Sequence, residues 1–401
     1  MKLEQSQIEK IKTDFRIMKS KEDFLQLLNN TKPIIYGKNS VPFELKQLTW
    51  YGNPKLGGKR YVEFKIKKKT SNTFRSIHAP VSGLKAIQKT LALILQCIYE
   101  PNFAAMGFVR NRSILDNAKL HVGNNYVYNI DLKDFFPSVD QARVWKCLQL
   151  EPFNLKDRLV INNLIASLCC TQLEVERLAE NGDWQKVKRN VLPQGAPTSP
   201  VITNIVCQRL DYKLSGVAKR FGLKYSRYAD DITFSSMKNV YKNDSDFIKE
   251  LRRIIAEQNF YIKESKTRLQ KDGFRKEVTG LLVNDKANVQ KRYIKQLRMW
   301  LYYWERYGYD KAYYFFVKQY LVEKGHVKKG RPEMKNVVAG KLHFLRMVKG
   351  EDNELYLKLK ARFDALIDSP TVLNKRQAHL EKVLNVLFNK GLDEAMNIYK
   401  P

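Results

Sequence analysis

The 401-residue sequence lacks long apolar segments and is short of acidic residues. No apolar run approaches the roughly 18 residues of a membrane-spanning helix, and the N-terminal segment MKLEQSQIEKIKTDF is mixed in charge, unlike a secretory signal. Asp and Glu number 41 against 72 Lys and Arg, a formal net charge of +31. That excess favours a polyanionic partner. We therefore expect a nucleic-acid partner and no membrane partner.

Cysteine is also scarce, with five in the chain. Their spacing fits no metal site, and all five have apolar neighbours: Cys97, Cys147, Cys169, Cys170 and Cys207. They are typical of buried thiols in a reducing compartment, which predicts a cytoplasmic protein. The sequence contains no internal repeat and no low-complexity linker. A hydrophobic content of 44% indicates a folded chain, and a length of 401 residues leaves room for two or three domains.

Hydrophobic periodicity predicts an α+β body followed by a helical C-terminal part. The predicted elements are a helical lead-in within residues 1–50, a basic hairpin at 60–80, a helix at 84–100, a strand at 126–139 that ends in a turn at Pro137, and a helical stretch at 140–181. They continue with a long helix capped by Thr198 or Ser199, a hairpin around 226–235, a helix at 244–258, strands up to 284, and helices from 288 on.

Two adjacent acids, Asp230 and Asp231, interrupt the strand-like run SRYADDITFS. Asp is depleted in strands, and neighbouring carboxylates repel each other. Asp131 ends an earlier apolar strand. Three carboxylates that meet at strand ends supply the hard oxygen ligands that two Mg²⁺ ions prefer, and two such ions can clamp the attacking and leaving oxygens of a phosphoryl transfer. The alternative is a polar turn and an unrelated surface acid.

Three segments, in order, resemble successive motifs of reverse transcriptase palms: NIDLKDFFPSV, LPQGAPTSPVITN and YADD. Further matches flank them. FKIKKKTSNTFR resembles the fingers segment that grips the incoming triphosphate, YIKESKT resembles the motif with a lysine near the pyrophosphate, and VTGLLVN occupies the primer-grip position. The resemblance implies a right-hand polymerase with fingers, palm and helical thumb, which copies RNA into DNA from dNTPs with two Mg²⁺ ions.

Two shorter segments are similar to signatures of retron reverse transcriptases. Asn117-Ala118-Lys119-Leu120-His121 matches the pattern Asn-Ala-x-x-His, and Val278-Thr279-Gly280 matches the triplet Val-Thr-Gly. Membership would imply a cognate structured non-coding RNA, a short RNA-linked single-stranded DNA (msDNA) started from a guanosine 2′-OH, and antiphage defence with an effector protein. The alternatives are a defence reverse transcriptase of another lineage, a group II intron-like enzyme, and a catalytically idle RNA-binding scaffold.

The resemblance also assigns roles residue by residue. Phe136 would exclude a 2′-OH from the nucleotide site, although core packing is the common fate of a Phe. Lys266 would protonate the leaving pyrophosphate, although a simple exposed lysine is the alternative. The full assignment is catalytic Asp131, Asp230, Asp231 and Lys266; metal-binding Asp131, Leu132, Asp230 and Asp231; dNTP-binding Lys68, Arg75, Phe136, Gln194 and Gly195; and nucleic-acid-binding Asn117, His121, Val278, Thr279, Gly280, Arg292, Lys295 and Arg298.

The same resemblance divides the chain into domains. It predicts a helical lead-in at 1–59, fingers at 60–125, a palm at 126–285 with a helical insertion at about 140–190, a thumb at 286–325 and a C-terminal helical extension at 326–401. Basic residues in the thumb are interleaved with aromatic ones. Basic side chains neutralise phosphates and aromatic rings stack on unpaired bases, so we expect the thumb to bind RNA.

Overall fold

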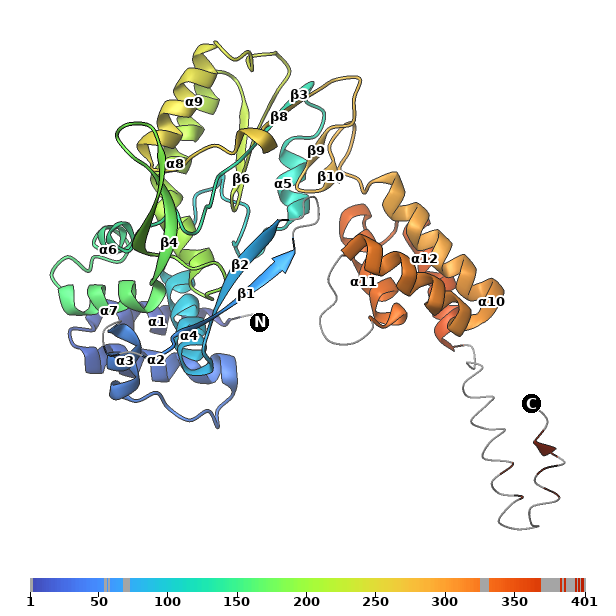
Figure 1. The fold of residues 1–401 in the computed structure, drawn as a ribbon, viewed down its shortest axis with the longest axis horizontal. Helices are drawn as coiled ribbons and strands as arrows, with labels where there is room; N and C mark the ends of the chain where they lie inside the picture. Colours follow the sequence, from blue (N-terminus) through green and yellow to red (C-terminus); the bar gives the residue numbers. More distant parts are fainter. Residues whose placement is uncertain are drawn as a thin grey trace. The chain divides into compact units, whose positions relative to one another are not determined.

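The structure, a computed structural model, describes residues 3–53, 56, 58–67, 73–324 and 332–368, and isolated positions between 383 and 399. The chain divides into two compact units, one made of residues 1–66 and 73–286 and one made mainly of residues 287–401 (Figure 1). Lys68, the turn of the predicted basic hairpin and most of the chain beyond residue 368 lie outside the described residues.

A four-stranded antiparallel sheet forms the centre of the first unit, in the order β6–β7–β3–β8. Ile130 lies opposite Ile232 and Tyr128 opposite Phe234, and all four side chains are buried. The bounds are β3 Tyr126–Asp131, β6 Lys224–Tyr228, β7 Asp231–Ser236 and β8 Arg268–Lys271. Helix α9 (Asp246–Glu257) covers the sheet by placing Phe247 edge-on against Phe234, with ring centroids 5.1 Å apart. Helix α8 (Ser199–Arg220) packs against α9 and β6.

The N-terminal helices pack around α4 (Ser82–Ile98). This helix carries buried apolar residues around most of its circumference, as a helix enclosed by other elements should. Helices α1 (Gln5–Ile17) and α2 (Lys21–Tyr36) pack against it, and α3 (Leu45–Gly52) packs against α2. Arg158 fixes the chain between α1 and α2, because its guanidinium donates to the main-chain oxygens of Phe15, Arg16 and Met18. Among the described residues, no helix is both long and apolar enough to cross a membrane.

The predicted helical stretch at 140–181 is wrong beyond residue 169. Helices α6 (Gln141–Leu148) and α7 (Leu159–Cys169) are followed by a hairpin of β4 (Thr171–Leu178) and β5 (Trp184–Val191). The segment TQLEVERL is rich in good helix formers, yet cross-strand pairs such as Glu174 opposite Lys188 stabilise the hairpin. Gly182, with a φ of 86°, supplies the turn. The predicted helical insertion at about 140–190 therefore consists of two helices followed by a two-stranded hairpin.

Two boundaries also differ from the prediction. The strand expected to run from residue 126 to a turn at Pro137 ends earlier, at Asp131, and residues 133–138 form turns. Thr198 is the residue before α8, as predicted, but its side chain makes no capping hydrogen bond. Ser199 begins the helix and its hydroxyl donates to the main-chain oxygen of Pro193.

Shorter elements complete the first unit. They are the hairpin of β1 (Tyr61–Lys67) and β2 (Phe74–Pro80), helix α5 (Ile114–Leu120), the 3₁₀ turn η1 (Glu264–Lys266), and the hairpin of β9 (Glu277–Val278) and β10 (Leu281–Leu282). All five cysteines are free; Cys147 is partly buried and the other four are buried.

The second unit is helical, as predicted. Helix α10 (Lys291–Lys324) is broken at Gly308, whose φ of 78° lies outside the helical range, and α11 (Met334–Lys349) and α12 (Glu354–Asp368) pack against it. Trp300 and Trp304 are buried, and their rings contact Phe316 and Phe363 respectively. The cationic residues lie on another side of α10, where Arg292, Lys295 and Arg298 are exposed.

Candidate active site

Three carboxylates lie together at one end of the central sheet. Asp131 ends β3 and lies directly opposite Asp231, the first residue of β7. Asp230 precedes Asp231 in the two-residue turn that joins β6 to β7. The turn is fixed from the side of β3, because the main-chain N–H of Leu132 donates to the main-chain oxygen of Asp230 (3.1 Å). The sheet register therefore brings the three predicted acids to one place.

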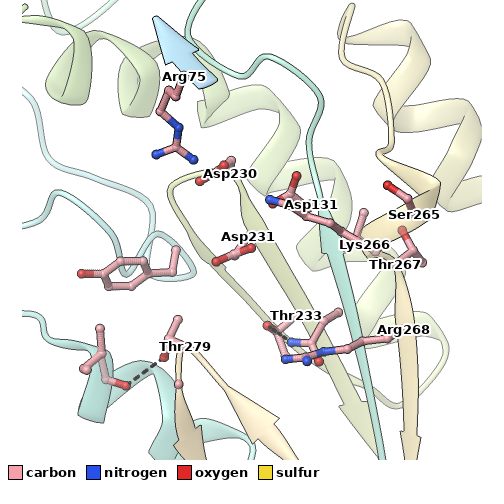
Figure 2. Close-up of a pocket in the computed structure, with 15 residues that line it drawn as sticks. Arg75, Asp131, Asp230, Asp231, Thr233, Ser265, Lys266, Thr267, Arg268 and Thr279 are labelled. Atoms are coloured by element: carbon pink, nitrogen blue, oxygen red, sulfur yellow. Dashed lines mark hydrogen bonds and ion pairs between the residues drawn. The ribbon is translucent and has the colours of Figure 1, made fainter. Parts of the chain in front are cut away.

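Cationic side chains partly offset this negative charge. The Lys266 ammonium lies 2.6 Å from Oδ2 of Asp131, and Figure 2 shows Arg75 reaching from β2 toward Asp230. Even so, burial and the neighbouring Asp131 raise the pKa of Asp230. Desolvation, then repulsion from Asp230 and Asp131, raises the pKa of Asp231 to about 6. Desolvation is thus the main cause of both raised pKa values, although three cations, Arg75, Lys266 and Arg268, line the same cavity as the three acids.

The donor set suits Mg²⁺ in chemistry, since the carboxylate oxygens are hard ligands. The described residues nevertheless contain no group of three or more His, Cys, Asp or Glu side chains arranged closely enough to hold a metal ion. Asp131 instead pairs with Lys266, and the side chain of Leu132 is buried, so that only its main chain can contribute. Side-chain rotation of the acids would be needed to bring the oxygens onto a shared cation.

A cavity of about 660 Å³ opens above the carboxylates. Its walls come from strands β2, β3 and β7, the 3₁₀ turn η1 and the turn between β9 and β10 (Figure 2). Among the lining residues are Arg75, Asp131, Asp230, Asp231, Lys266, Thr279 and Gly280. An anionic substrate entering it meets Arg75 and Lys266 at the same time as the acids.

Gln194 and Gly195 join the loop before α8 to strand β2. The main-chain oxygen of Gln194 accepts a hydrogen bond from His78 N–H (2.8 Å). Gly195 has a φ of 123°, and a Cβ at this position would lie 2.9 Å from the main-chain oxygen of His78. The glycine is therefore required for close approach to β2, the strand that also carries Arg75.

Phe136 is half-buried, between the rings of Phe108 and Phe135.

The two short signatures meet in one buried chain of hydrogen bonds. The Ser226 hydroxyl donates its proton to Asn117 Oδ1. The Ser226 oxygen must therefore accept a hydrogen bond from His121, and this places the imidazole proton on Nε2. Nδ1 of His121 then accepts from Ser235. The contacts are Ser235 Oγ to His121 Nδ1 (2.7 Å), His121 Nε2 to Ser226 Oγ (2.7 Å), Ser226 Oγ to Asn117 Oδ1 (2.6 Å), Asn117 Nδ2 to Thr279 Oγ1 (3.4 Å) and Thr279 Oγ1 to the Ile114 main-chain oxygen (3.3 Å).

The burial of this hydrogen-bonded series argues against the direct contact with nucleic acid that was expected for three of the residues. Asn117, His121 and Val278 have almost no exposed surface, so they touch no nucleic acid in this conformation. Thr279 and Gly280 form the turn between β9 and β10, both with positive φ (47° and 84°), and both line the cavity. A Thr at positive φ is strained, and its two hydrogen bonds hold it there. The buried members thus link the β6–β7 hairpin, which carries Asp230 and Asp231, to the turn that faces the cavity.

Comparison with known proteins now decides the family. Residues 66–292 match the family model described as reverse transcriptase (RNA-dependent DNA polymerase). The retron Ec86 reverse transcriptase of Escherichia coli is 35% identical over 244 residues, which cover 60% of this chain and 68% of that protein. The chain belongs to the retron-type reverse transcriptases. The predicted family and the right-hand polymerase fold with extra C-terminal helices are confirmed.

Other retron reverse transcriptases align over a smaller share of their length. The Mx65 enzyme of Myxococcus xanthus is 35% identical over an alignment that covers 62% of this chain and 57% of the Mx65 enzyme. The Mx162 enzyme of the same organism is 36% identical over an alignment that covers 59% of this chain and 51% of the Mx162 enzyme. The chain thus spans little more than half of these two relatives. Among solved structures, a telomerase of Candida albicans with a telomeric RNA fragment matches with a TM-score of 0.40 and 12% identity, over 77% of this chain and 63% of that one.

Sequence reasoning missed a buried ion pair behind the turn that carries Asp230. Arg227 is fully buried, and its guanidinium donates to both carboxylate oxygens of Asp211 (2.7 and 2.6 Å), to Asn204 Oδ1 and to the main-chain oxygen of Ala229. Ala229 immediately precedes Asp230 and has a φ of 58°. The only signal in the sequence was an arginine inside an otherwise strand-like run.

His121 predicts a pH dependence of stability. Burial, aided by the charge of Lys224, lowers the pKa of His121 to about 3. The unfolded chain binds a proton here below about pH 6.5 and the folded chain does not, so stability is full above that pH and falls as the pH drops toward the folded value. Between pH 7 and pH 4 we expect a loss of about 3 kcal/mol from this residue.

Urea unfolding measured across that range tests the expectation. His121→Gln should remove most of the pH-dependent loss, whereas the control His343→Gln, at a histidine exposed on α11, should leave it unchanged. An unaltered pH profile in the His121 variant would contradict a neutral, buried imidazole.

Proposed function

We propose that the protein is the RNA-directed DNA polymerase of a retron, which reverse-transcribes part of a cognate structured non-coding RNA into a short RNA-linked single-stranded DNA. The observation that carries the proposal is the meeting of Asp131, Asp230 and Asp231 at the wall of a cavity that also presents Arg75 and Lys266. Nucleotidyl transfer needs anionic ligands for divalent ions and cations for a triphosphate in one place, and both are present here.

The residues divide the chemistry among them. Two Mg²⁺ ions, bound by the three carboxylates and the main chain of Leu132, would supply the charge that stabilises the attacking and leaving oxygens. Arg75 holds the triphosphate through a bidentate fork, and we assign Lys68 to neutralise the same triphosphate as a point charge. Lys266, with its ammonium beside Asp131 at the cavity wall, donates a proton to the departing pyrophosphate.

Further roles concern the base pair and the sugar. Gln194 and Gly195 pack under the nascent base pair. Phe136 meets C2′ of the incoming nucleotide and excludes a 2′-OH by its bulk. Its half-buried position leaves part of the ring available for that contact.

The proposal extends to domains and partners. The fingers would span 60–125, the palm 126–285 and the thumb 286–325, and the extension 326–401 is left without a role. The partners would be the cognate RNA, its DNA product (msDNA), dNTPs and an effector protein in antiphage defence, as the family resemblance implies. Five free cysteines support a reducing, cytoplasmic setting.

Incubation of the purified protein with a primed RNA template, dNTPs and Mg²⁺ tests the proposal. DNA complementary to the template is the expected product. RNA binding without any incorporation would favour the idle scaffold. Sequencing of nucleic acid that co-purifies with the protein should return one structured RNA joined to a short DNA, and a group II intron-like enzyme would return no such hybrid.

The exposed cations of α10 predict salt-dependent RNA binding. Arg292, Lys295 and Arg298 recur at helical spacing and are all exposed. Changing the three to Gln should weaken binding of the cognate RNA and reduce the slope of log K against log salt by roughly 0.7 for each phosphate that is no longer neutralised. Affinity measured between low and near-physiological salt gives the slope.

A charge-matched control separates a local effect from net charge. Lys10, Lys38 and Lys219 are exposed in the first unit, and their replacement by Gln removes the same three charges. Equal slopes in the two triple variants would show that α10 does not bind phosphates specifically.

A further inference from the structure

The loop before α5 lies along the outer edge of the catalytic hairpin. Ala105 forms a parallel bridge with Arg227, and Met106 N–H donates to the main-chain oxygen of Arg227 (2.7 Å). Gly107 then packs flush against the turn, because a Cβ there would lie 2.5 Å from the main-chain nitrogen of Ala229. The next residue, Phe108, therefore emerges directly beside the residues that carry the catalytic acids.

Phe108 is held in an unfavourable conformation. Its φ is 63°, in the left-handed region that residues with a Cβ rarely adopt, and its side chain is 40% exposed. The surrounding loop imposes this geometry, since Asn204 Nδ2 donates to the Gly107 oxygen (3.0 Å) and one nitrogen of Arg112 donates to three loop carbonyls. Strain that the structure maintains in this way is typical of functional positions.

The ring of Phe108 contacts Phe136. Their centroids are 6.0 Å apart with planes at 38°, within the range of favourable aromatic pairs. On its other side Phe136 contacts Phe135 (5.6 Å), which is buried and stacks on Phe260 (5.6 Å). Phe136 is thus fixed between one ring anchored in the core and one ring at the surface.

We propose that Phe108 is a positioning residue for sugar discrimination, which holds the Phe136 ring at the depth where it meets C2′ of the incoming nucleotide. The inference rests on the proposed function, and it adds a residue outside the palm motifs to the nucleotide site. Loss of the Phe108 ring opens space on the solvent side of Phe136. The Phe136 ring then turns into that space, and room for a 2′-OH appears.

The efficiency ratio of rNTP to dNTP incorporation measures this role. Phe108→Ala should raise the ratio by about 2- to 10-fold, the range expected when an aromatic pair is removed. Phe108→Leu, which keeps most of the bulk, should restore the wild-type ratio. Phe103, in the same loop and 68% exposed, provides the control, and Phe103→Ala should leave the ratio unchanged.

A double variant shows whether Phe108 acts through Phe136. Phe136→Ala alone should raise the ratio more than Phe108→Ala, and Phe108→Ala should add nothing when Phe136 is already Ala. An unchanged ratio in Phe108→Ala, or additive effects in the double variant, would overturn the positioning role.

A spectroscopic measurement separates this inference from the proposed function. With 4-fluorophenylalanine at position 136, the ¹⁹F resonance of the folded protein should shift on Phe108→Ala and not on Phe103→Ala. Failure of the wild-type protein to make DNA would reject the proposed function while leaving this ring contact measurable. A ¹⁹F resonance that Phe108→Ala does not move would reject the contact itself.

Discussion

We expect the double variant Asp230→Asn with Asp231→Asn to lose DNA synthesis, with the rate of dNTP incorporation lowered at least about 1000-fold. The double variant removes two of the three carboxylates that line the cavity and so the charge that would hold the metal ions. Primer extension on an RNA template in Mg²⁺ measures the loss. Asp230→Asn alone should cost more than Asp231→Asn, since the family resemblance assigns Asp230 to both metal ions.

The fold should survive this substitution. Desolvation raises the pKa of both acids, and repulsion from Asp131 adds to it, so removal of both charges relieves an unfavourable arrangement in the hairpin. We expect no loss of thermal stability and no loss of RNA binding. Asp244→Asn with Asp285→Asn, at two exposed acids of the same unit, is the charge-matched control and should retain full activity. Robust synthesis by the Asp230/Asp231 variant would remove the metal-binding assignment.

The position of the candidate site was predictable because Asp230 and Asp231 break a local rule. Adjacent aspartates inside a strand-like run are unfavourable on their own, so the pattern points to a ligand. The register that sets Asp131 opposite Asp231 follows once β3 and β7 pair. Arg75 lines the cavity and Gly195 approaches β2 closely, while the roles that the local motifs give them stay predictions.

Other features depend on tertiary contacts that a local pattern does not encode. The segment TQLEVERL favours a helix by composition, and only pairing with β5 makes it a strand. Asn117 and His121 look like exposed polar residues of a short helix, yet partners from β6, β7 and the β9–β10 turn bury them. Buried polar groups of this kind are recognised only when their distant hydrogen-bond partners are known.

The pair of Arg227 and Asp211 has the largest expected effect on stability. Both side chains are almost completely buried and joined by two short hydrogen bonds. Burial opposes the charge on Arg227, but Asp211 more than offsets this and keeps the pKa of Arg227 above its ordinary value. Asp211→Ala leaves that charge buried without a partner, which should cost about 3–5 kcal/mol of unfolding free energy. Urea unfolding at neutral pH measures the loss.

A double substitution separates stability from catalysis. Asp211→Leu with Arg227→Met leaves no buried charge and should recover most of the lost stability, because apolar replacements of a buried pair are often neutral or better. Activity should remain low, since the main-chain oxygen of Ala229 no longer has the donor that holds the turn before Asp230. Recovery of both stability and DNA synthesis in the double variant would show that the pair serves folding alone. Recovery of stability without synthesis would establish Arg227 as the residue that positions the catalytic turn.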